Sequence, residues 1–254
     1  MTESANALPL DALPSAAHGL DARLRNIVLD APDIASLAAF YTSLAGWTVA
    51  DGDAEWINMR TPDGWPIALQ AAPDHVPPRW PDPAYPQQAH LDLRFPDIDA
   101  AAESASALGA TLLRRNESWH TLADPAGHPV DVCRADNPQP TLMGVMLDCP
   151  DAHALATFYS KMLGKPITYD AGGAAMIGHD GEQPLLFHQI AGYRAPQWPD
   201  PAHPQQFHLD LTVDDIEAAE PIALALGATQ LPAEGENWRV YTDPVGKPFC
   251  LCWD

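Results

Sequence analysis

Hydrophobic and polar positions along the chain alternate between two periods. Apolar residues recur every three or four positions from 34 to 45, which predicts an amphipathic helix. Asp33 before this stretch is a favourable N-cap, and Gly46 after it is a common helix end. Short apolar runs predict strands at 26–30, 47–50, 55–59 and 66–71. The order of elements is therefore βαβββ.

The same order of elements recurs along the chain. A strand is expected at 89–95, a helix from Asp97 to Gly109, and strands at 111–114, 119–123 and 130–134. The second half of the sequence gives the same elements, including a helix at 215–226. The pattern thus predicts four βαβββ modules, which span roughly 24–71, 88–134, 142–189 and 206–252.

A long internal repeat explains this recurrence. The string WPDPAYPQQAHLDL begins at Trp80, and WPDPAHPQQFHLDL begins at Trp198 with the same spacing that relates His90 to His208. A repeat of this length is a whole domain. We therefore expect a first domain at 23–136 and a second at 137–254. The preceding residues 1–22 lie outside the repeat and are expected to form a flexible arm.

The charge and composition of the chain argue against some classes of binding partner. The formal net charge is −21, and such an acidic chain repels phosphate backbones, which argues against nucleic acid. Either solubility or a cationic ligand explains the charge. No stretch resembles a signal peptide or reaches membrane-spanning length, which argues against a membrane partner. The four cysteines form no C-x-x-C motif, which suits a reduced protein of the cytoplasm.

Several motifs together resemble one superfamily. A helix ends in Phe-Tyr-x-x-x-x-Gly, a strand reads His-Leu-Asp-Leu, a later helix ends in Leu-Gly-Ala, and a turn reads Asp-Pro-x-Gly. With the paired modules, these features resemble the vicinal-oxygen-chelate superfamily, in particular its glyoxalase-like branch. That superfamily includes glyoxalase I, bleomycin-resistance proteins and extradiol dioxygenases. The resemblance implies an α+β fold of four βαβββ modules that form two curled eight-stranded mixed sheets around cavities.

The resemblance also implies positions for metal ligands. In metal-dependent members, ligands come from the first and last strands of each paired module. The matching positions in this chain are Asn26, Gly144, Gln70, His188, His90, His208, Asp131 and Cys250. Only the histidines of the two His-Leu-Asp-Leu strands match the superfamily's pattern outright, and Asp131 matches in kind.

How the modules pair decides which of these residues meet. Each repeat either closes on itself or exchanges modules, so that module one pairs with four and two with three. Proline-rich arms of about sixteen residues reach roughly 50 Å, which favours the exchange. One cavity would then hold a divalent metal (iron, zinc, manganese or nickel) on His90, Asp131 and His188, with Gly144 leaving a position open. The other would be metal-free and would hold Asn26, Gln70, His208 and Cys250.

Strand alternation predicts which side chains face the cavities. In His-Leu-Asp-Leu the leucines share one face, so His90 with Asp92, and His208 with Asp210, share the other. Each histidine is either a metal ligand or a buried, hydrogen-bonded group. Asp92 and Asp210 are candidate general bases, or they orient the neighbouring histidine.

Aromatic residues are candidates for ligand contact. Trp80 and Trp198 lie in the proline-rich arms, where each either packs the arm onto the sheet or stacks on a planar ligand. Trp119 and Trp238 lie on strands near the expected cavity rims. Beside Trp238, Arg239 is a candidate anion contact, and His208 is a further candidate ligand contact.

These observations leave several functions open for a protein that acts on or binds a small molecule. It is either a metal-dependent lyase, isomerase or dioxygenase of glyoxalase type, or a metal-free binding protein that sequesters a drug-like or cationic metabolite. An accessory protein that binds a substrate is a third alternative. In each case the chain would work as a monomer that imitates a dimer, or as a homodimer.

Overall fold

The computed structural model describes residues 19–82, 84–198, 200 and 205–254. The first repeat contains β1 (Arg23–Ala31), α1 (Ile34–Ala45), β2 (Thr48–Gly52), β3 (Trp56–Arg60), β4 (Pro66–Ala71), β5 (Ala89–Phe95), α2 (Ile98–Ala107), β6 (Thr111–Arg115), β7 (Trp119–Ala123) and β8 (Pro129–Arg134). The second contains β9 (Thr141–Cys149), α3 (Ala152–Leu163), β10 (Ile167–Ala171), β11 (Ala174–Ile177), β12 (Leu185–Gln189), β13 (Phe207–Thr212), α4 (Ile216–Leu226), β14 (Thr229–Glu234), β15 (Trp238–Thr242) and β16 (Pro248–Cys252). Every module has a helix between its first and second strands, which confirms the predicted order.

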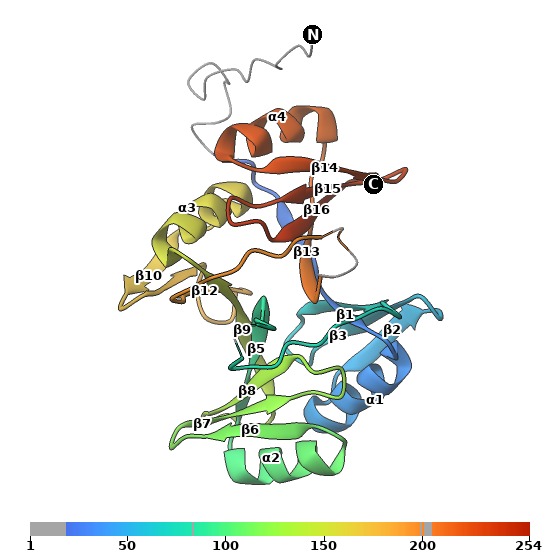
Figure 1. The fold of residues 1–254 in the computed structure, drawn as a ribbon, viewed down its shortest axis with the longest axis vertical. Coiled ribbons are helices and arrows are strands. Elements are labelled where there is room, and N and C mark those ends of the chain that lie inside the picture. Colours follow the sequence, from blue (N-terminus) through green and yellow to red (C-terminus); the bar gives the residue numbers. More distant parts are fainter. Residues whose placement is uncertain (1–18, 83, 199, 201–204) are drawn as a thin grey trace.

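The strands form two open eight-stranded mixed sheets (Figure 1). Sheet A has the order β14-β15-β16-β13-β1-β4-β3-β2, and sheet B has the order β10-β11-β12-β9-β5-β8-β7-β6. Module one therefore joins module four, and module two joins module three. The exchange of modules between the repeats is confirmed.

Helices hold the two modules of each repeat together. α1 packs beside α2, and α3 packs beside α4, so that each repeat stays compact while its strands join the other repeat (Figure 1). The buried face of β1 contributes Ile27 and Leu29 to the hydrophobic core. The N-caps are the predicted aspartates: Asp33, for example, accepts from the amide of Ser36.

The Phe-Tyr and Asp-Pro-x-Gly motifs are joined by a buried hydrogen bond. The Tyr41 hydroxyl on α1 donates to Asp124 at 2.9 Å. Asp124 closes its own turn by accepting from the amides of Ala126 and His128, both at 2.9 Å. In the second repeat, Tyr159 donates to Asp243 at 3.1 Å. Both motifs thus serve the same purpose, which is to fix a helix of one module to a turn of the next.

The residues before β1 dock onto the other repeat. Residues 1–18 of the expected flexible arm lie outside the described residues. At its end, the amide of Leu20 donates to the Lys161 carbonyl at 2.7 Å, and the amide of Ala22 donates to the Met162 carbonyl at 2.9 Å. These bonds satisfy carbonyls in the last turn of α3, which otherwise lack helical partners. Residues 19–22 are therefore attached to α3.

No helix within the described ranges is long and apolar enough to cross a membrane.

Removing the motif tyrosine hydroxyls should destabilise the fold. Tyr41→Phe and Tyr159→Phe each leave a buried carboxylate without one donor, and a hydrogen bond to a charged group contributes about 2 kcal/mol. We expect each variant to lose about that much free energy of unfolding in urea. Tyr169→Phe is the matched control, because Tyr169 is 51% exposed. Equal stability of all three variants would contradict this account of the motifs.

Candidate functional site

The two His-Leu-Asp-Leu strands present opposite faces to core and cavity. Leu209 and Leu211 on β13 are fully buried in the core, whereas His208 and Asp210 line a cavity on the other face of sheet A. On β5 of sheet B, Leu91 and Leu93 likewise belong to the core. The predicted placement of the leucines in the core is confirmed on both strands, and His208 and Asp210 face the cavity as expected.

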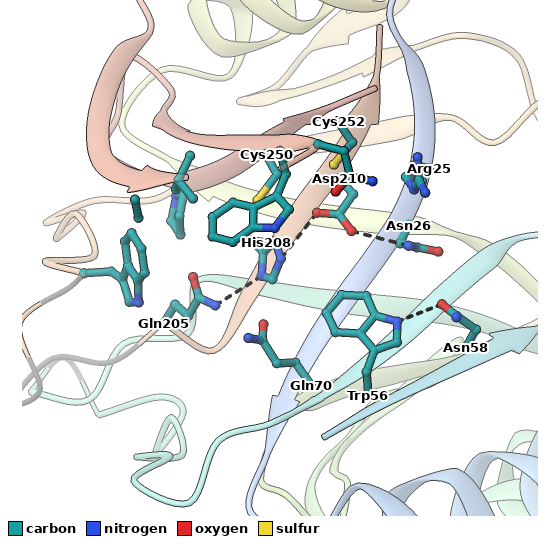
Figure 2. Close-up of a pocket in the computed structure, with 16 residues that line it drawn as sticks. Arg25, Asn26, Trp56, Asn58, Gln70, Gln205, His208, Asp210, Cys250 and Cys252 are labelled. Atoms are coloured by element: carbon teal, nitrogen blue, oxygen red, sulfur yellow. Dashed lines mark hydrogen bonds and ion pairs between the residues drawn. The ribbon is translucent and has the colours of Figure 1, made fainter. Parts of the chain in front are cut away.

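The cavity of sheet A has a volume of about 490 Å³ (Figure 2). Its walls come from both halves of the sheet. Module one contributes Asn26, Trp56 and Gln70, and module four contributes His208, Trp238 and Cys250. Trp198 from the second proline-rich arm completes an aromatic lining. The exchange of modules is thus what brings the predicted set of Asn26, Gln70, His208 and Cys250 together.

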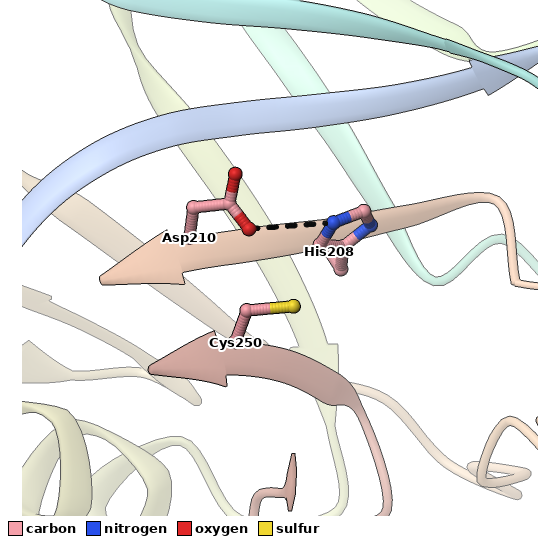
Figure 3. Close-up of side chains that lie close together, drawn as sticks. All are labelled: His208, Asp210 and Cys250. Atoms are coloured by element: carbon pink, nitrogen blue, oxygen red, sulfur yellow. Dashed lines mark ion pairs between the residues drawn. The ribbon is translucent and has the colours of Figure 1, made fainter. Parts of the chain in front are cut away.

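Polar groups in this cavity are largely paired with one another. His208 Nε2 lies 3.5 Å from Asp210 Oδ1, and the side-chain amide of Asn26 donates to the other Asp210 oxygen at 3.3 Å. The side-chain nitrogen of Gln205 lies 3.2 Å from His208 Nδ1. Cys250 lies beside this pair on the neighbouring strand (Figure 3).

Burial and pairing set the protonation of the cavity groups. Burial raises the pKa of Asp210, but the hydrogen bond and charge of His208 outweigh it and bring the pKa below the usual value. Burial, together with the charge of Asp210, raises the pKa of the Cys250 thiol far above its usual range. Asp210 is therefore ionised and paired, and Cys250 is a neutral thiol.

Sheet B holds the related group of His90, Asp92 and Asp131. Its ligand atoms lie within 4.8 Å of one another, with His90 Nε2 at 3.5 Å from Asp92 Oδ1 and 3.9 Å from Asp131 Oδ2. Burial raises the pKa of Asp92 to about 6, and the charge of His90 only partly opposes this. Asp92 is therefore a buried acid whose charge is only partly compensated by its surroundings.

Small differences between the repeats change the space available at equivalent positions of the two sheets. The side chain of Leu186 occupies the space above Gly144, where an added Cβ would lie 2.1 Å from Leu186 Cδ1. The position that the sequence suggested was open is therefore closed by a leucine. In sheet A, the equivalent residues are Asn26 and the small Ala68, which leaves room in the cavity.

His188 lies in the same sheet as its expected partners His90 and Asp131. Among the described residues, however, the closely spaced group around them is completed by Asp92. His188 Nδ1 lies 3.6 Å from Asp148 Oδ1, and the nearby Asp148 carboxylate raises the pKa of His188 despite partial burial. The side chain of His188 is half exposed.

Some of the tryptophan and arginine candidates line the sheet A cavity, and others do not. Trp198 and Trp238 line the sheet A cavity, and Trp119 is the partly exposed counterpart of Trp238 on sheet B. Arg239 points to the helix side, where it pairs with Glu217 at 2.7 Å and Glu220 at 3.1 Å. Strand alternation accounts for this, because neighbours of Trp238 face away from the cavity. Trp80 is partly buried and does not line the sheet A cavity.

Sequence reasoning missed two glutamines and two buried acids. Gln87 and Gln205 each precede a strand histidine by three residues and contact its Nδ1. Gln87 also donates to Asp148 at 2.7 Å, and Gln205 forms the equivalent hydrogen bond to Asp30. The repeated Pro-Gln-Gln triplet before each histidine was the signal that could have found them.

Two groups of three potential metal ligands lie close together, one in each sheet. They are His90–Asp92–Asp131 and His208–Asp210–Cys250, and within each group the ligand atoms are close enough to hold an ion. Asp210 already accepts a hydrogen bond from Asn26 and lies beside His208, and Gln87 contacts His90 Nδ1. Both groups therefore fit a metal by spacing, while their donors are also engaged with neighbouring side chains.

Asp92 and Asp210 should respond to pH with opposite signs. The folded-state pKa of Asp92 is about 6, against an ordinary value of 3.8, so its stabilising contribution exists in acid and is lost as pH rises through 6. The loss approaches about 3 kcal/mol, because each pH unit between the two pKa values costs about 1.4 kcal/mol. Asp92→Asn should therefore become more stable relative to the wild type from pH 5 to pH 8 in urea unfolding.

Asp210 provides the matched comparison for that measurement. Its folded-state pKa is lowered, so its contribution is present at neutral pH and is lost as pH falls through the acid range. Asp210→Asn should destabilise the protein at pH 8 by about 1–3 kcal/mol, the value of a hydrogen bond to a charged group. If both variants changed stability in the same direction at pH 8, the assigned environments would be wrong.

Comparisons with known proteins agree with this architecture. A family model described as a glyoxalase-like domain matches residues 26–133 and again 144–252. Glyoxalase I from Zea mays superposes with a TM-score of 0.63 and 20% identity, over 91% of this chain and 92% of that one. A putative dioxygenase from Bacillus subtilis subsp. subtilis str. 168 gives 0.58 and 11%, over 93% of this chain and 86% of that one.

No curated protein matches the chain. At these identities the solved structures show a shared fold and nothing about activity. The family model, in contrast, accounts for most of the chain in two consecutive copies. The chain therefore belongs to the family of proteins built from glyoxalase-like domains.

Proposed function

We propose that this protein binds a planar small molecule in the cavity of sheet A and does so without a metal. The observation that carries the proposal is the aromatic lining, in which Trp56, Trp198 and Trp238 surround a volume of about 490 Å³. Cavities of roughly 300–1,000 Å³ suit drug-sized ligands. Indole rings supply a large flat apolar surface with a polar N–H at one edge.

The protonation of the cavity supports binding rather than turnover. A general base works best with a pKa near the working pH, and the pKa of Asp210 is lowered by its partners. A nucleophilic cysteine must be a thiolate, and the pKa of Cys250 is raised by burial and by Asp210. Both groups are therefore better suited to hydrogen bonding with a ligand than to reacting with it.

Charge favours a cationic ligand. The chain carries a formal charge of −21, and its summed field attracts cations toward a cavity. Arg25, the cationic side chain at the cavity, has its own partner in Asp254 at 3.3 Å. A planar cation in the cavity would lie among three indole rings and close to the Asp210 carboxylate, and cations are attracted to indole faces.

An enzymatic function is a second candidate, and Asp92 is the observation that favours it. A carboxyl group with a pKa of about 6 is ionised at neutral pH yet basic enough to abstract a proton. The sheet B group would then serve a lyase or isomerase, with Asp92 as the general base and His90 and Asp131 beside it. The names of the structural relatives, a glyoxalase I and a putative dioxygenase, support an enzyme in general terms.

Calorimetric titration with acridine dyes tests the binding proposal. The planar cation aminoacridine should bind with one site per chain, and acridine carboxylate, an anion of similar shape, should bind more weakly. Trp238→Ala should weaken aminoacridine binding at least about fivefold, since one aromatic contact with a cation contributes about 1 kcal/mol.

The other repeat supplies the matched control. Trp119 occupies the equivalent position on sheet B with similar exposure, 40% against 38% for Trp238, so Trp119→Ala should leave binding unchanged. Equal weakening by both variants, or no binding of either dye, would count against the sheet A cavity as the binding site.

A further inference from the structure

The side chain of Gln87 bridges a buried acid and the histidine of sheet B. Its amide nitrogen lies 2.7 Å from Asp148 Oδ2 and 3.1 Å from His90 Nδ1. Gln87 is 9% exposed and Asp148 is 2% exposed, so water does not replace these contacts. Gln87 therefore uses both hydrogens of one NH₂ group on two neighbours.

The acid determines which way the amide faces. Asp148 Oδ2 accepts the hydrogen bond, so Gln87 turns its NH₂ rather than its carbonyl toward Asp148. The second hydrogen of the same NH₂ then points at His90 Nδ1, which must accept it with a lone pair. A neutral imidazole carries one proton, and that proton is left on Nε2.

We propose that Gln87 is a positioning residue that fixes His90 in its Nε2-protonated tautomer. The Nε2–H then faces Asp92 at 3.5 Å and Asp131 at 3.9 Å. His90 thus presents a hydrogen-bond donor to the two acids beside it, whose oxygens are acceptors.

This tautomer opposes metal binding at a group whose spacing would otherwise suit it. A histidine that ligates a metal usually donates its other N–H to a carboxylate or a carbonyl. His90 has the reverse arrangement, because its other nitrogen receives a hydrogen from Gln87. Ligation through Nε2 would move the proton to Nδ1, against the NH₂ of Gln87. Turning the amide over would then bring its carbonyl against Asp148, with two acceptors in contact.

The second repeat carries the same arrangement in sheet A. Gln205 lies 3.2 Å from His208 Nδ1 and also hydrogen bonds to Asp30. Burial lowers the pKa of His208, but Asp210 outweighs burial and raises it. His208 therefore gains a second proton more readily, and the tautomer is best examined at His90.

Nuclear magnetic resonance of the intact chain reads the tautomer directly. Long-range proton–nitrogen correlation spectra at about pH 8.5, well above the ordinary imidazole pKa of about 6.5, identify which nitrogen of His90 is protonated. His90→Gln assigns the signal by its disappearance. We expect protonation at Nε2. Protonation at Nδ1 in the wild-type protein would overturn the proposal without any further variant.

An exchange of amide and acid tests the role of Gln87. The double variant Gln87→Glu/Asp148→Asn conserves net charge and nearly conserves volume, but it places a carboxylate beside Nδ1. His90 should then donate from Nδ1, and Nε2 should become free to ligate. Changes of such outer partners alter metal affinity by about 10- to 100-fold. We expect Co²⁺, followed by its visible absorption and by calorimetry, to bind at least tenfold more tightly than to the wild type.

The corresponding exchange in sheet A is the control. Gln205→Glu/Asp30→Asn should leave the His90 signals and Co²⁺ binding at the sheet B group unchanged. A wild-type protein that binds Co²⁺ through His90 Nε2 as tightly as the double variant would overturn the proposal. So would a double variant that folds, judged by circular dichroism, and keeps the Nε2-protonated signal.

Discussion

The antiparallel pairing of β1 with β13, and of β5 with β9, is the constraint on which both candidate sites depend. Each pair lies at the centre of a sheet and joins strands from different repeats, with Val28 opposite His208 in sheet A and His90 opposite Met146 in sheet B. Gln88 and Gln206 reinforce the junction, since each backbone amide donates to the side-chain carbonyl of the other, at 3.1 and 3.0 Å. Without these pairs, the tryptophan of module one would not meet the histidine of module four.

The duplicated scaffold then allows the two cavities to differ. In sheet A, Asn26 donates to Asp210 and Ala68 leaves space, so the charges are compensated and the volume is open. In sheet B, Leu186 fills the space above Gly144, and Asp92 remains buried with its pKa raised to about 6. The two sheets thus share one topology. Sheet A carries an aromatic cavity whose charged groups are paired, and sheet B carries a buried acid whose charge is only partly compensated.

Sequence periodicity was enough to predict the order of helices and strands, because its cause is local, whereas the two eight-stranded sheets were expected only from the family resemblance. Alternation placed Leu91 and Leu93 in the core, and the helical spacing before Gly46 predicted α1 with its correct end. The exchange of modules could be predicted from the length of the arms. The site residues were harder to predict, because the partner of a side chain depends on residues that are distant in the sequence. His188 has Asp148 beside it, and Arg239 has two glutamates of α4, which no spacing in the sequence reveals.

The buried Asp-Pro-x-Gly turns explain why the cavity groups can be held so firmly. In the second repeat, Lys247 is almost fully buried; it interacts with Asp243 and donates to the backbone carbonyl of Gln88 at the junction between the sheets. His128 has the equivalent position in the first repeat and pairs with Asp124 at 3.0 Å. The backbone amide of Lys247 also donates to Asp243 at 2.9 Å. The contacts of this turn, together with the hydrogen bond from Lys247 to the carbonyl of Gln88, therefore anchor the backbone next to Gln87. A fixed backbone is what allows one amide orientation to determine the tautomer of a histidine.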